Sequence, residues 1–443
     1  MGSWLLKTFA DIDIVSGPFP YAVLAVAGLL TGVLVTQVGL RRRQRPRRRL
    51  LGVLIAVSGG VALGVLFFFT FGVWWNVFGI PIPESVAVYV AGFGGAVAIA
   101  VLSLQRARWW RAVLSAVTVM VVLAATSLAS VAAFGINPTL GSLVGITPSS
   151  DASDPVPLAP LTTKPLTDLG TTWKPPHGMP SHGTTRSVSI PPTHSGFHAR
   201  DAGLYLPPAA LTPDAPRLPL MIMMMGQPGN PDPQYVGAVL DRFAARNHGL
   251  APIVVVADQL GDPGQDPGCT DSARFGNAET YVTVDVLDWA RQHLNVDASG
   301  ATTTIAGYSN GGACAMLYAA KYPDDFHNVI SISGELYPGA ENPPAMLDSV
   351  FAGNQAAYDA QKPENNFPGH SYSGLAVFTA SSDDPLYVQF AQKAQLLFAH
   401  AGFASQFGEV PHGGHVLGAI NGGLPIAFAA LYPTLGLQVP PEH

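Results

Sequence analysis

The sequence predicts an α/β domain with a mainly parallel sheet, preceded by an all-α region of four transmembrane helices. Three observations lead to this prediction. Four long apolar runs lie within residues 1–135 of the 443-residue chain. A stretch rich in Pro, Ser and Thr follows over residues 136–183. From residue 184 to 443, short apolar strands alternate with helical stretches, which is the pattern of a parallel sheet covered by helices.

The four apolar runs are long and free of charge at their centres. They cover approximately residues 21–40, 50–73, 85–104 and 112–134. Each is long enough to cross about 30 Å of hydrocarbon as a helix. Because intramembrane charges usually mark a transport path, their absence favours an anchor over a transporter or channel. Five glycines in the second and third runs favour close packing of these helices; they are Gly59, Gly60, Gly92, Gly94 and Gly95.

The loops between the runs predict the orientation in the membrane. Seven arginines lie in RRRQRPRRR, residues 41–49, and three more lie in residues 105–111. Residues 75–84 contain neither Lys nor Arg. The positive-inside rule therefore places both arginine-rich loops in the cytoplasm, and both termini with the C-terminal domain outside the cell. A signal peptide fits poorly, because Asp11 and Asp13 precede the first run and three further runs follow.

Composition limits the partners that the chain can have. The formal net charge is −6, and the clustered basic residues lie between apolar runs, so we expect no binding of nucleic acid. Residues 136–183 cannot bury a core and should form an extended tether. The alternative is that part of this segment packs along the domain as an ordered arm.

Eight strands are predicted after the tether. They cover residues 185–190, 202–205, 218–225, 252–257, 302–306, 329–333, 375–379 and 405–409, with helical stretches that include 277–293 and 311–321. Continuous apolar runs such as LPLMIMMM and PIVVVA indicate strands that are buried on both faces. The alternation of strand and helix predicts parallel pairing through right-handed crossovers.

The strongest chemical signal is the sequence Gly-Tyr-Ser-Asn-Gly, residues 307–311. It follows an apolar strand and begins a helix, which is the context of a nucleophile elbow. The turn is so tight that glycines must flank the serine, and it exposes the hydroxyl above the end of the strand. Ser309 is therefore the predicted nucleophile. The alternative is a Gly-rich strand–helix turn with no chemical role.

A nucleophilic serine needs a base and an acid that orients this base, in the chain order Ser, acid, His. A predicted strand ends just before Asp383 and Asp384, and the last one ends just before His412 and His415. We prefer His415, because two glycines precede it and let its loop reach the nucleophile. We prefer Asp384, which precedes a proline, although it could instead cap the following helix.

An oxyanion hole requires backbone N–H groups aimed at the developing charge. One should come from Asn310, directly after the nucleophile, and one from the loop Gly226-Gln227-Pro228-Gly229. Pro228 has no N–H, so Gln227 is the expected donor. The alternative is a simple Gly-Pro turn.

No metal or cofactor is expected. The histidines are scattered without ligand spacing, and no phosphate-binding or dinucleotide fingerprint occurs. The loop with Asp262, Asp266 and Asp271 lacks the glycine and glutamate of a calcium loop and is interpreted as a solvated loop. Cys269 and Cys314 can form one disulfide if the domain is extracytoplasmic, or remain as two buried thiols.

At these residues the chain resembles the Putative esterase family of α/β hydrolases, which includes esterase D and the antigen 85 mycolyltransferases. The resemblance covers roughly residues 186–432 and depends on MMMGQPG, DPGCTDSARFGNAETYVTVDVLDWARQHL, GYSNGGACAMLYAAKYPDDF, ISISGEL and PHGGH. It implies an α/β-hydrolase fold. It also implies a triad of Ser309, Asp384 and His415, with Gln227 and Asn310 as oxyanion donors. The four preceding helices resemble those of membrane-anchored actinobacterial esterases.

These features predict a membrane-anchored, extracytoplasmic serine esterase or acyltransferase acting through an acyl-serine intermediate on lipid or glycolipid esters. Val416 and Leu417 follow His415 where the mycolyltransferases carry an aromatic residue, so ester hydrolysis is expected over mycolyl transfer. The alternative is a non-catalytic membrane receptor on a hydrolase scaffold. The acyl chain, the acceptor and the oligomeric state do not follow from the sequence.

Overall fold

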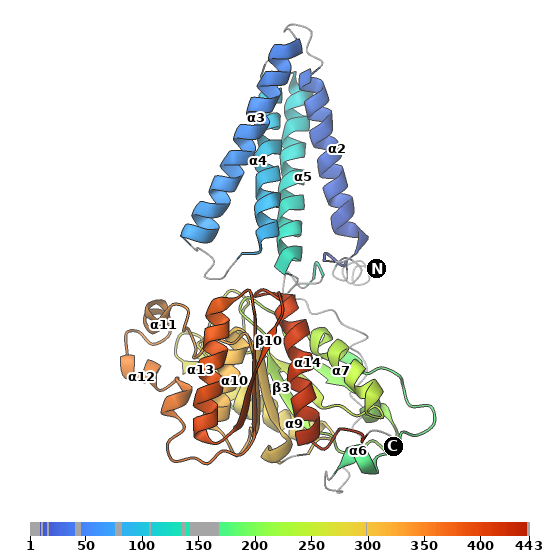
Figure 1. Cartoon of the computed structure of the whole chain (residues 1–443), viewed down its shortest axis with the longest axis vertical. Coiled ribbons are helices and arrows are strands. Elements are labelled where there is room, and N and C mark those ends of the chain that lie inside the picture. Colours follow the sequence, from blue (N-terminus) through green and yellow to red (C-terminus); the bar gives the residue numbers. More distant parts are fainter. Residues whose placement is uncertain are drawn as a thin grey trace. The chain divides into compact units, whose positions relative to one another are not determined.

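The computed structural model describes residues 9, 12–15, 17–39, 46–75, 82–105, 108–134, 139–141, 168–297 and 299–440. The chain forms two compact units, Met1–Ile146 and Thr147–His443 (Figure 1). The arginine-rich loop at residues 41–49 falls largely outside the described residues, as does the tether up to residue 167.

The first unit is a group of long apolar helices, as predicted. Its helices are α2 (Pro18–Gly39), α3 (Pro46–Phe67) continued by the π-helix η1 (Phe68–Trp74), α4 (Glu84–Leu104) and α5 (Trp109–Phe134). Four stretches are long and apolar enough to cross a membrane; they are Pro18–Val38, Leu50–Trp74, Glu84–Leu104 and Trp109–Phe134. The apolar side chains at their surface, such as Leu29, Leu63 and Val88, are exposed in the isolated unit and suit contact with lipid.

Small residues let α3 and α4 approach closely. A Cβ placed on Gly60 would lie 2.3 Å from the carbonyl oxygen of Gly94, and one on Gly94 would lie 2.2 Å from that of Gly60. Gly95 also faces α3, whereas nothing lies within 4 Å of a Cβ on Gly59 or Gly92. Three of the five glycines therefore form the predicted helix contact. Gly59 and Gly92 do not, because they lie on helix faces without a neighbour.

The second unit contains all eight predicted strands in one sheet. The strands are β1 (Thr184–Val188), β2 (Ala202–Leu206), β3 (Leu220–Met224), β4 (Ile253–Ala257), β7 (Thr304–Tyr308), β8 (Asn328–Ile332), β9 (Leu375–Ser381) and β10 (Ala404–Val410). Their order is β1-β2-β4-β3-β7-β8-β9-β10. The strands from β3 and β4 to β10 pair in parallel, and β1 and β2 pair antiparallel at one edge. A two-stranded ribbon of β5 (Asp271–Ser272) and β6 (Gly276–Asn277) was not predicted.

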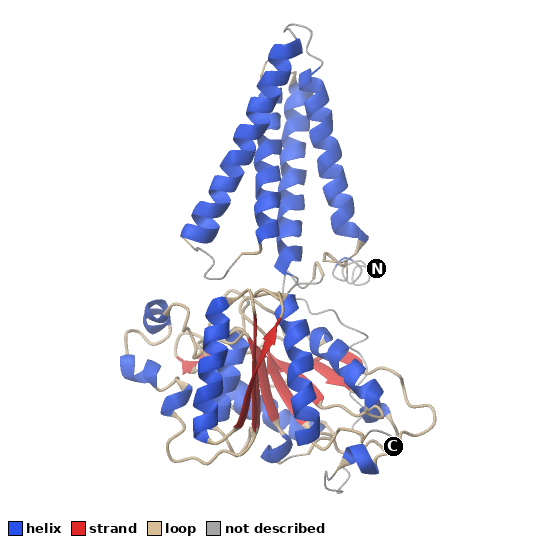
Figure 2. Ribbon diagram, in the orientation of Figure 1, coloured by secondary structure: helices blue, strands red, loops and turns tan. Residues whose placement is uncertain are grey.

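Helices cover both faces of this sheet (Figure 2). The long ones are α7 (Gln234–Arg246) and α14 (Leu417–Thr434) on one side, and α10 (Asn310–Lys321) and α13 (Pro385–Ala401) on the other. The shorter ones are α8 (Ala278–Thr280), η4 (Tyr281–Val286), α9 (Leu287–His293), α11 (Pro343–Ser349) and α12 (Gln355–Asp359), with the 3-10 turns η3 (Pro208–Leu211), η5 (Gly300–Thr302) and η6 (Pro363–Asn365). Every residue of β3, β4, β7, β8 and β9 is buried, which confirms strands covered on both faces.

Residues 168–183 form an ordered arm on the second unit. They contain the short helix α6 (Leu169–Thr172). The Gly170 N–H donates to the carbonyl oxygen of Gly436 at 2.9 Å, and Trp173 Nε1 donates to that of His248 at 3.1 Å. The ordered-arm alternative therefore describes this end of the tether, and the packed domain begins before residue 184.

Candidate active site

The turn that carries Ser309 has the geometry of a nucleophile elbow. Ser309 lies between β7 and α10 with φ 53° and ψ −119°, a strained conformation for a residue with a side chain. A Cβ on Gly307 would lie 2.0 Å from the Gly311 carbonyl oxygen, and one on Gly311 would lie 2.3 Å from that of Met224. Only glycine fits at these two positions. The local sequence thus holds the serine at the end of its strand.

His415 and Asp384 complete a chain of hydrogen bonds that begins at Ser309. Ser309 Oγ lies 2.8 Å from His415 Nε2, and His415 Nδ1 lies 2.8 Å from Asp384 Oδ2. The three residues are buried, with exposed fractions of 7%, 6% and 1% for Ser309, His415 and Asp384. They follow β7, β10 and β9 respectively. Because parallel strands end at the same edge of a sheet, residues far apart in sequence meet there.

His412 and Asp383, the alternatives for the base and the acid, do not take part in this chain of hydrogen bonds. His412 is exposed to solvent. Asp383 Oδ1 accepts a hydrogen bond from the Gly414 N–H at 2.9 Å and so shapes the loop that carries His415. Asp384 precedes α13, but its side chain makes no capping hydrogen bond. The structure therefore brings Asp384, and not Asp383, to the imidazole.

Two tyrosines flank the imidazole of His415. The ring centroid of Tyr308 lies 5.3 Å from that of His415 with an interplanar angle of 30°, and that of Tyr387 lies 3.9 Å away. Tyr387 is in the first turn of α13, and its hydroxyl donates to the carboxylate of Glu341. The two rings restrict the imidazole, and aromatic rings at these distances favour a cationic neighbour.

Two glutamates lie in the segment that follows β8. Burial, together with the nearby carboxylates of Asp266 and Glu341, raises the pKa of Glu335 to about 8. The Glu335 carboxylate accepts a hydrogen bond from the Glu341 N–H at 3.4 Å. Burial also raises the pKa of Glu341. Such shifts are frequent at functional sites.

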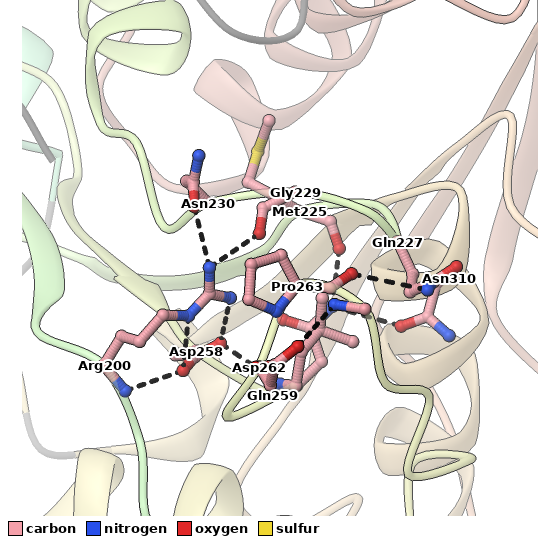
Figure 3. Close-up of polar contacts among 12 residues, drawn as sticks. Arg200, Met225, Gln227, Gly229, Asn230, Asp258, Gln259, Asp262, Pro263 and Asn310 are labelled. Carbon is pink, nitrogen blue, oxygen red and sulfur yellow. Dashed lines mark hydrogen bonds and ion pairs between the residues drawn. The ribbon is translucent and has the colours of Figure 1, made fainter. Parts of the chain in front are cut away.

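The two segments expected to supply oxyanion donors both border Ser309. Asn310 begins α10, so its N–H has no acceptor within the helix. Gly226 packs against the serine, because a Cβ on Gly226 would lie 3.1 Å from Ser309 Cβ. Gln227 follows it, and its side chain donates to the Pro263 carbonyl oxygen at 3.4 Å (Figure 3).

Sequence reasoning missed a set of polar side chains behind this loop. Arg200 donates to the carbonyl oxygen of Gly229 and is paired with Asp258, and Gln259 donates to the carbonyl oxygen of Met225 just before the loop, as Figure 3 shows. Asp262 is exposed, as expected for a solvated loop, but Asp266 accepts a hydrogen bond from Asn310 Nδ2 at 3.0 Å. The only sequence signal was the position of Asp258 and Gln259 directly after the apolar run PIVVVA, at the carboxyl end of a strand.

Cys269 and Cys314 form a disulfide. The disulfide joins the loop after β4 to α10, one turn beyond Asn310. The alternative of two free thiols therefore does not describe the structure. Within the described residues, no group of three or more His, Cys, Asp or Glu side chains is placed to hold a metal ion.

The chain is similar to several known proteins. Residues 198–405 match the family model described as Putative esterase. An uncharacterized protein of Corynebacterium glutamicum is 28% identical over 459 residues, which cover 99% of this chain and 100% of that protein. Among solved structures, an S-formylglutathione hydrolase from Agrobacterium tumefaciens is 18% identical, with 58% of this chain and 97% of that chain covered and a TM-score of 0.46. MPT51 of Mycobacterium tuberculosis is 17% identical, with 57% and 98% covered and a TM-score of 0.39.

The sheet order, the elbow at Ser309 and the buried Ser–His–Asp contacts define a serine hydrolase with an α/β-hydrolase fold. The match to the Putative esterase family model spans residues 198–405 of the second unit and includes Ser309 and Asp384. The protein is therefore a carboxylic ester hydrolase, and its four apolar helices make it a membrane protein.

Proposed function

We propose that this protein is a membrane-anchored, extracytoplasmic serine esterase or acyltransferase that acts on acyl esters of lipids or envelope glycolipids. The observation that carries the chemistry is the pair of 2.8 Å contacts from Ser309 Oγ to His415 and from His415 to Asp384. Nucleophile, base and orienting acid are thus within hydrogen-bond distance and shielded from water.

Acylation of Ser309 is the first step. His415 Nε2 takes the hydroxyl proton while Ser309 Oγ attacks the ester carbonyl carbon. The carbonyl oxygen becomes an alkoxide, which the N–H groups of Gln227 and Asn310 stabilise. The bond to the alcohol then breaks, and His415 gives its proton to the departing oxygen. Asp384 keeps the proton of Nδ1 in place and stabilises the imidazolium.

Deacylation repeats these steps with a new acceptor. A water molecule, or the hydroxyl of a sugar or lipid, loses its proton to His415 and attacks the acyl-serine carbon. The Ser309–acyl bond breaks, and the proton returns to Ser309 Oγ. Water as acceptor gives hydrolysis, and an alcohol gives acyl transfer.

The membrane unit supports the proposed substrate class. Tethering to a bilayer raises the effective concentration of esters that reside in the same bilayer. The arginine-rich loops in the sequence support an extracytoplasmic domain through the positive-inside rule. Lipid-linked acyl esters are therefore the substrates that the architecture favours.

The test compares the full-length protein with its Ser309→Ala variant in lipid vesicles. The substrates are a phospholipid or acylated glycolipid in the vesicle and p-nitrophenyl butyrate in solution, with and without a disaccharide acceptor. We expect Ser309-dependent release or transfer of acyl groups, with faster turnover of the vesicle-borne ester at equal concentration. A protein that turns over only the soluble ester contradicts the lipid assignment. Turnover of neither, by folded protein, supports the receptor alternative.

A further inference from the structure

A partly buried ion pair between Arg200 and Asp258 contacts the far end of the loop of residues 225–230. Arg200 Nη2 lies 2.6 Å from Asp258 Oδ1 and Arg200 Nε lies 3.0 Å from Oδ2, so the pair is bidentate. Arg200 Nη1 also donates to the carbonyl oxygen of Gly229 at 3.0 Å and to Asn230 Oδ1 at 2.7 Å (Figure 3). Asp258 is 1% exposed. One guanidinium therefore joins the end of β4 to the far end of the loop.

Gln259 connects the two backbone segments that supply the oxyanion donors. Its Nε2 donates to the carbonyl oxygen of Met225 at 2.5 Å and to Asn310 Oδ1 at 3.1 Å, which uses both of its hydrogens. Met225 stands two residues before Gln227, and Asn310 carries the second donor. Gln259 is buried, so these bonds form away from water.

Asn310 is held from its other side as well. Its Nδ2 donates to Asp266 Oδ1 at 3.0 Å, and the same oxygen accepts from the Gly268 N–H at 2.8 Å. Both ends of the Asn310 amide are thus fixed, and its backbone N–H is fixed with them.

The strand register explains why these side chains meet. Met224 pairs with Ala257 of β4 and with Gly307 of β7, so β3 and β4 end at one level and β7 ends one residue later. The residues that follow these strands, Met225, Asp258 and Ser309, therefore emerge at the same edge of the sheet.

The loop offers few contacts of its own to fix its conformation. Residues 226–229 read Gly-Gln-Pro-Gly, so two members lack side chains and a third lacks an N–H. A displaced donor loses most of its effect on a transition-state charge, because such stabilisation depends on preorganised dipoles. Arginine suits this task, since its planar fork bonds the aspartate and the loop at once, which lysine cannot do.

We propose that Arg200, Asp258 and Gln259 are positioning residues that hold the N–H groups of Gln227 and Asn310 at the oxyanion site. They act through the loop and do not touch the substrate. This inference rests on the proposed function and adds the residues that set the strength of its oxyanion hole.

The test uses Gln259→Met, which keeps the length of the side chain and removes both donors, and Arg200→Lys, which keeps the charge and removes the fork. The matched control is Arg291→Lys in a partly exposed Arg–Asp pair with Asp325. The full-length proteins are compared by kcat and KM for p-nitrophenyl butyrate, and by affinity for an alkyl trifluoromethyl ketone. The ketone forms a tetrahedral oxyanion on the serine and so reports on the oxyanion hole.

We expect Gln259→Met and Arg200→Lys to lower kcat by about 10- to 100-fold, less than the roughly 100- to 1,000-fold cost of deleting an oxyanion donor. KM should change less than about threefold, and the ketone should bind more weakly by a factor similar to the loss in kcat. The control should match the wild type.

Folded variants that keep wild-type kcat and ketone affinity would overturn the inference, even if their melting temperature falls. A change confined to KM would do the same. Failure of the proposed function is distinguishable, because the wild-type protein itself would then neither hydrolyse the ester nor bind the ketone through Ser309.

Discussion

The two adjacent aspartates, Asp383 and Asp384, touch different groups and should therefore respond differently to the same substitution. Asp384→Asn should lower kcat about 10⁴-fold, because an amide at this position favours the wrong imidazole tautomer. Asp383→Asn keeps an oxygen that can accept from the Gly414 N–H, so its kcat should fall less than about tenfold. Ester turnover by the two purified variants checks this. A larger loss in Asp383→Asn would reassign the acid.

Glu335 gives the stability of the protein a dependence on pH. Its pKa rises from 4.5 to about 8 on burial, so between these values the folded state binds more protons than the unfolded state. Stability must then fall as pH rises through this window and level off above about pH 8. Melting temperatures at successive pH values should show this decline, and Glu335→Gln should make it shallower. The exposed Glu409→Gln is the control. Equal slopes in all three proteins would contradict the assignment.

Among the elements of secondary structure, the sequence predicted correctly those features that depend on one strand or one turn alone. Continuous apolar runs predicted strands such as β3 and β4, because strands buried on both faces need continuous apolar residues. The elbow was predictable because only glycine fits at positions 307 and 311, so the sequence shows the glycines that the turn requires. The contact of His415 with Ser309 and Asp384 was predictable from chain order and from their positions at strand ends.

The contacts that the sequence did not reveal connect segments far apart in the chain. Arg200 precedes Asp258 by 58 residues, and Gln259 bonds Asn310 across 51 residues. No local pattern encodes such a pair, since it depends on how the loops fold over the strand ends. Residues 168–183 were ambiguous for the same reason, because their partners, such as Gly436, lie at the other end of the domain.

The disulfide between the loop after β4 and α10 should stabilise the second unit. It closes a loop with a sequence separation of 45 residues. Replacing Cys269 and Cys314 together by alanine should lower the free energy of unfolding by about 2–4 kcal/mol. Chemical denaturation measures this, and a reductant should reproduce the loss in the wild type while leaving the double variant unchanged. Equal stability with and without the bridge would contradict it.

For the whole molecule, the proposed orientation places the ester hydrolase outside the cell. It depends on the arginines at residues 41–49 and 105–111, which the positive-inside rule assigns to the cytoplasm. Alkaline phosphatase, which is active only after export, should be active when fused after residue 443 and inactive when fused after Gln44. The reverse pattern would move the catalytic unit into the cytoplasm and exclude envelope glycolipids as substrates.

If the proposed function is right, Ser309 is an activated nucleophile within a membrane-anchored esterase. Treating the full-length protein with a fluorophosphonate and locating the adduct by mass spectrometry tests this most directly. We expect one adduct, on Ser309, that is absent from Ser309→Ala and forms much more slowly in a His415→Ala variant, which has lost the general base. A folded protein that stays unlabelled, or carries the label on another serine, would show that Ser309 is not the nucleophile.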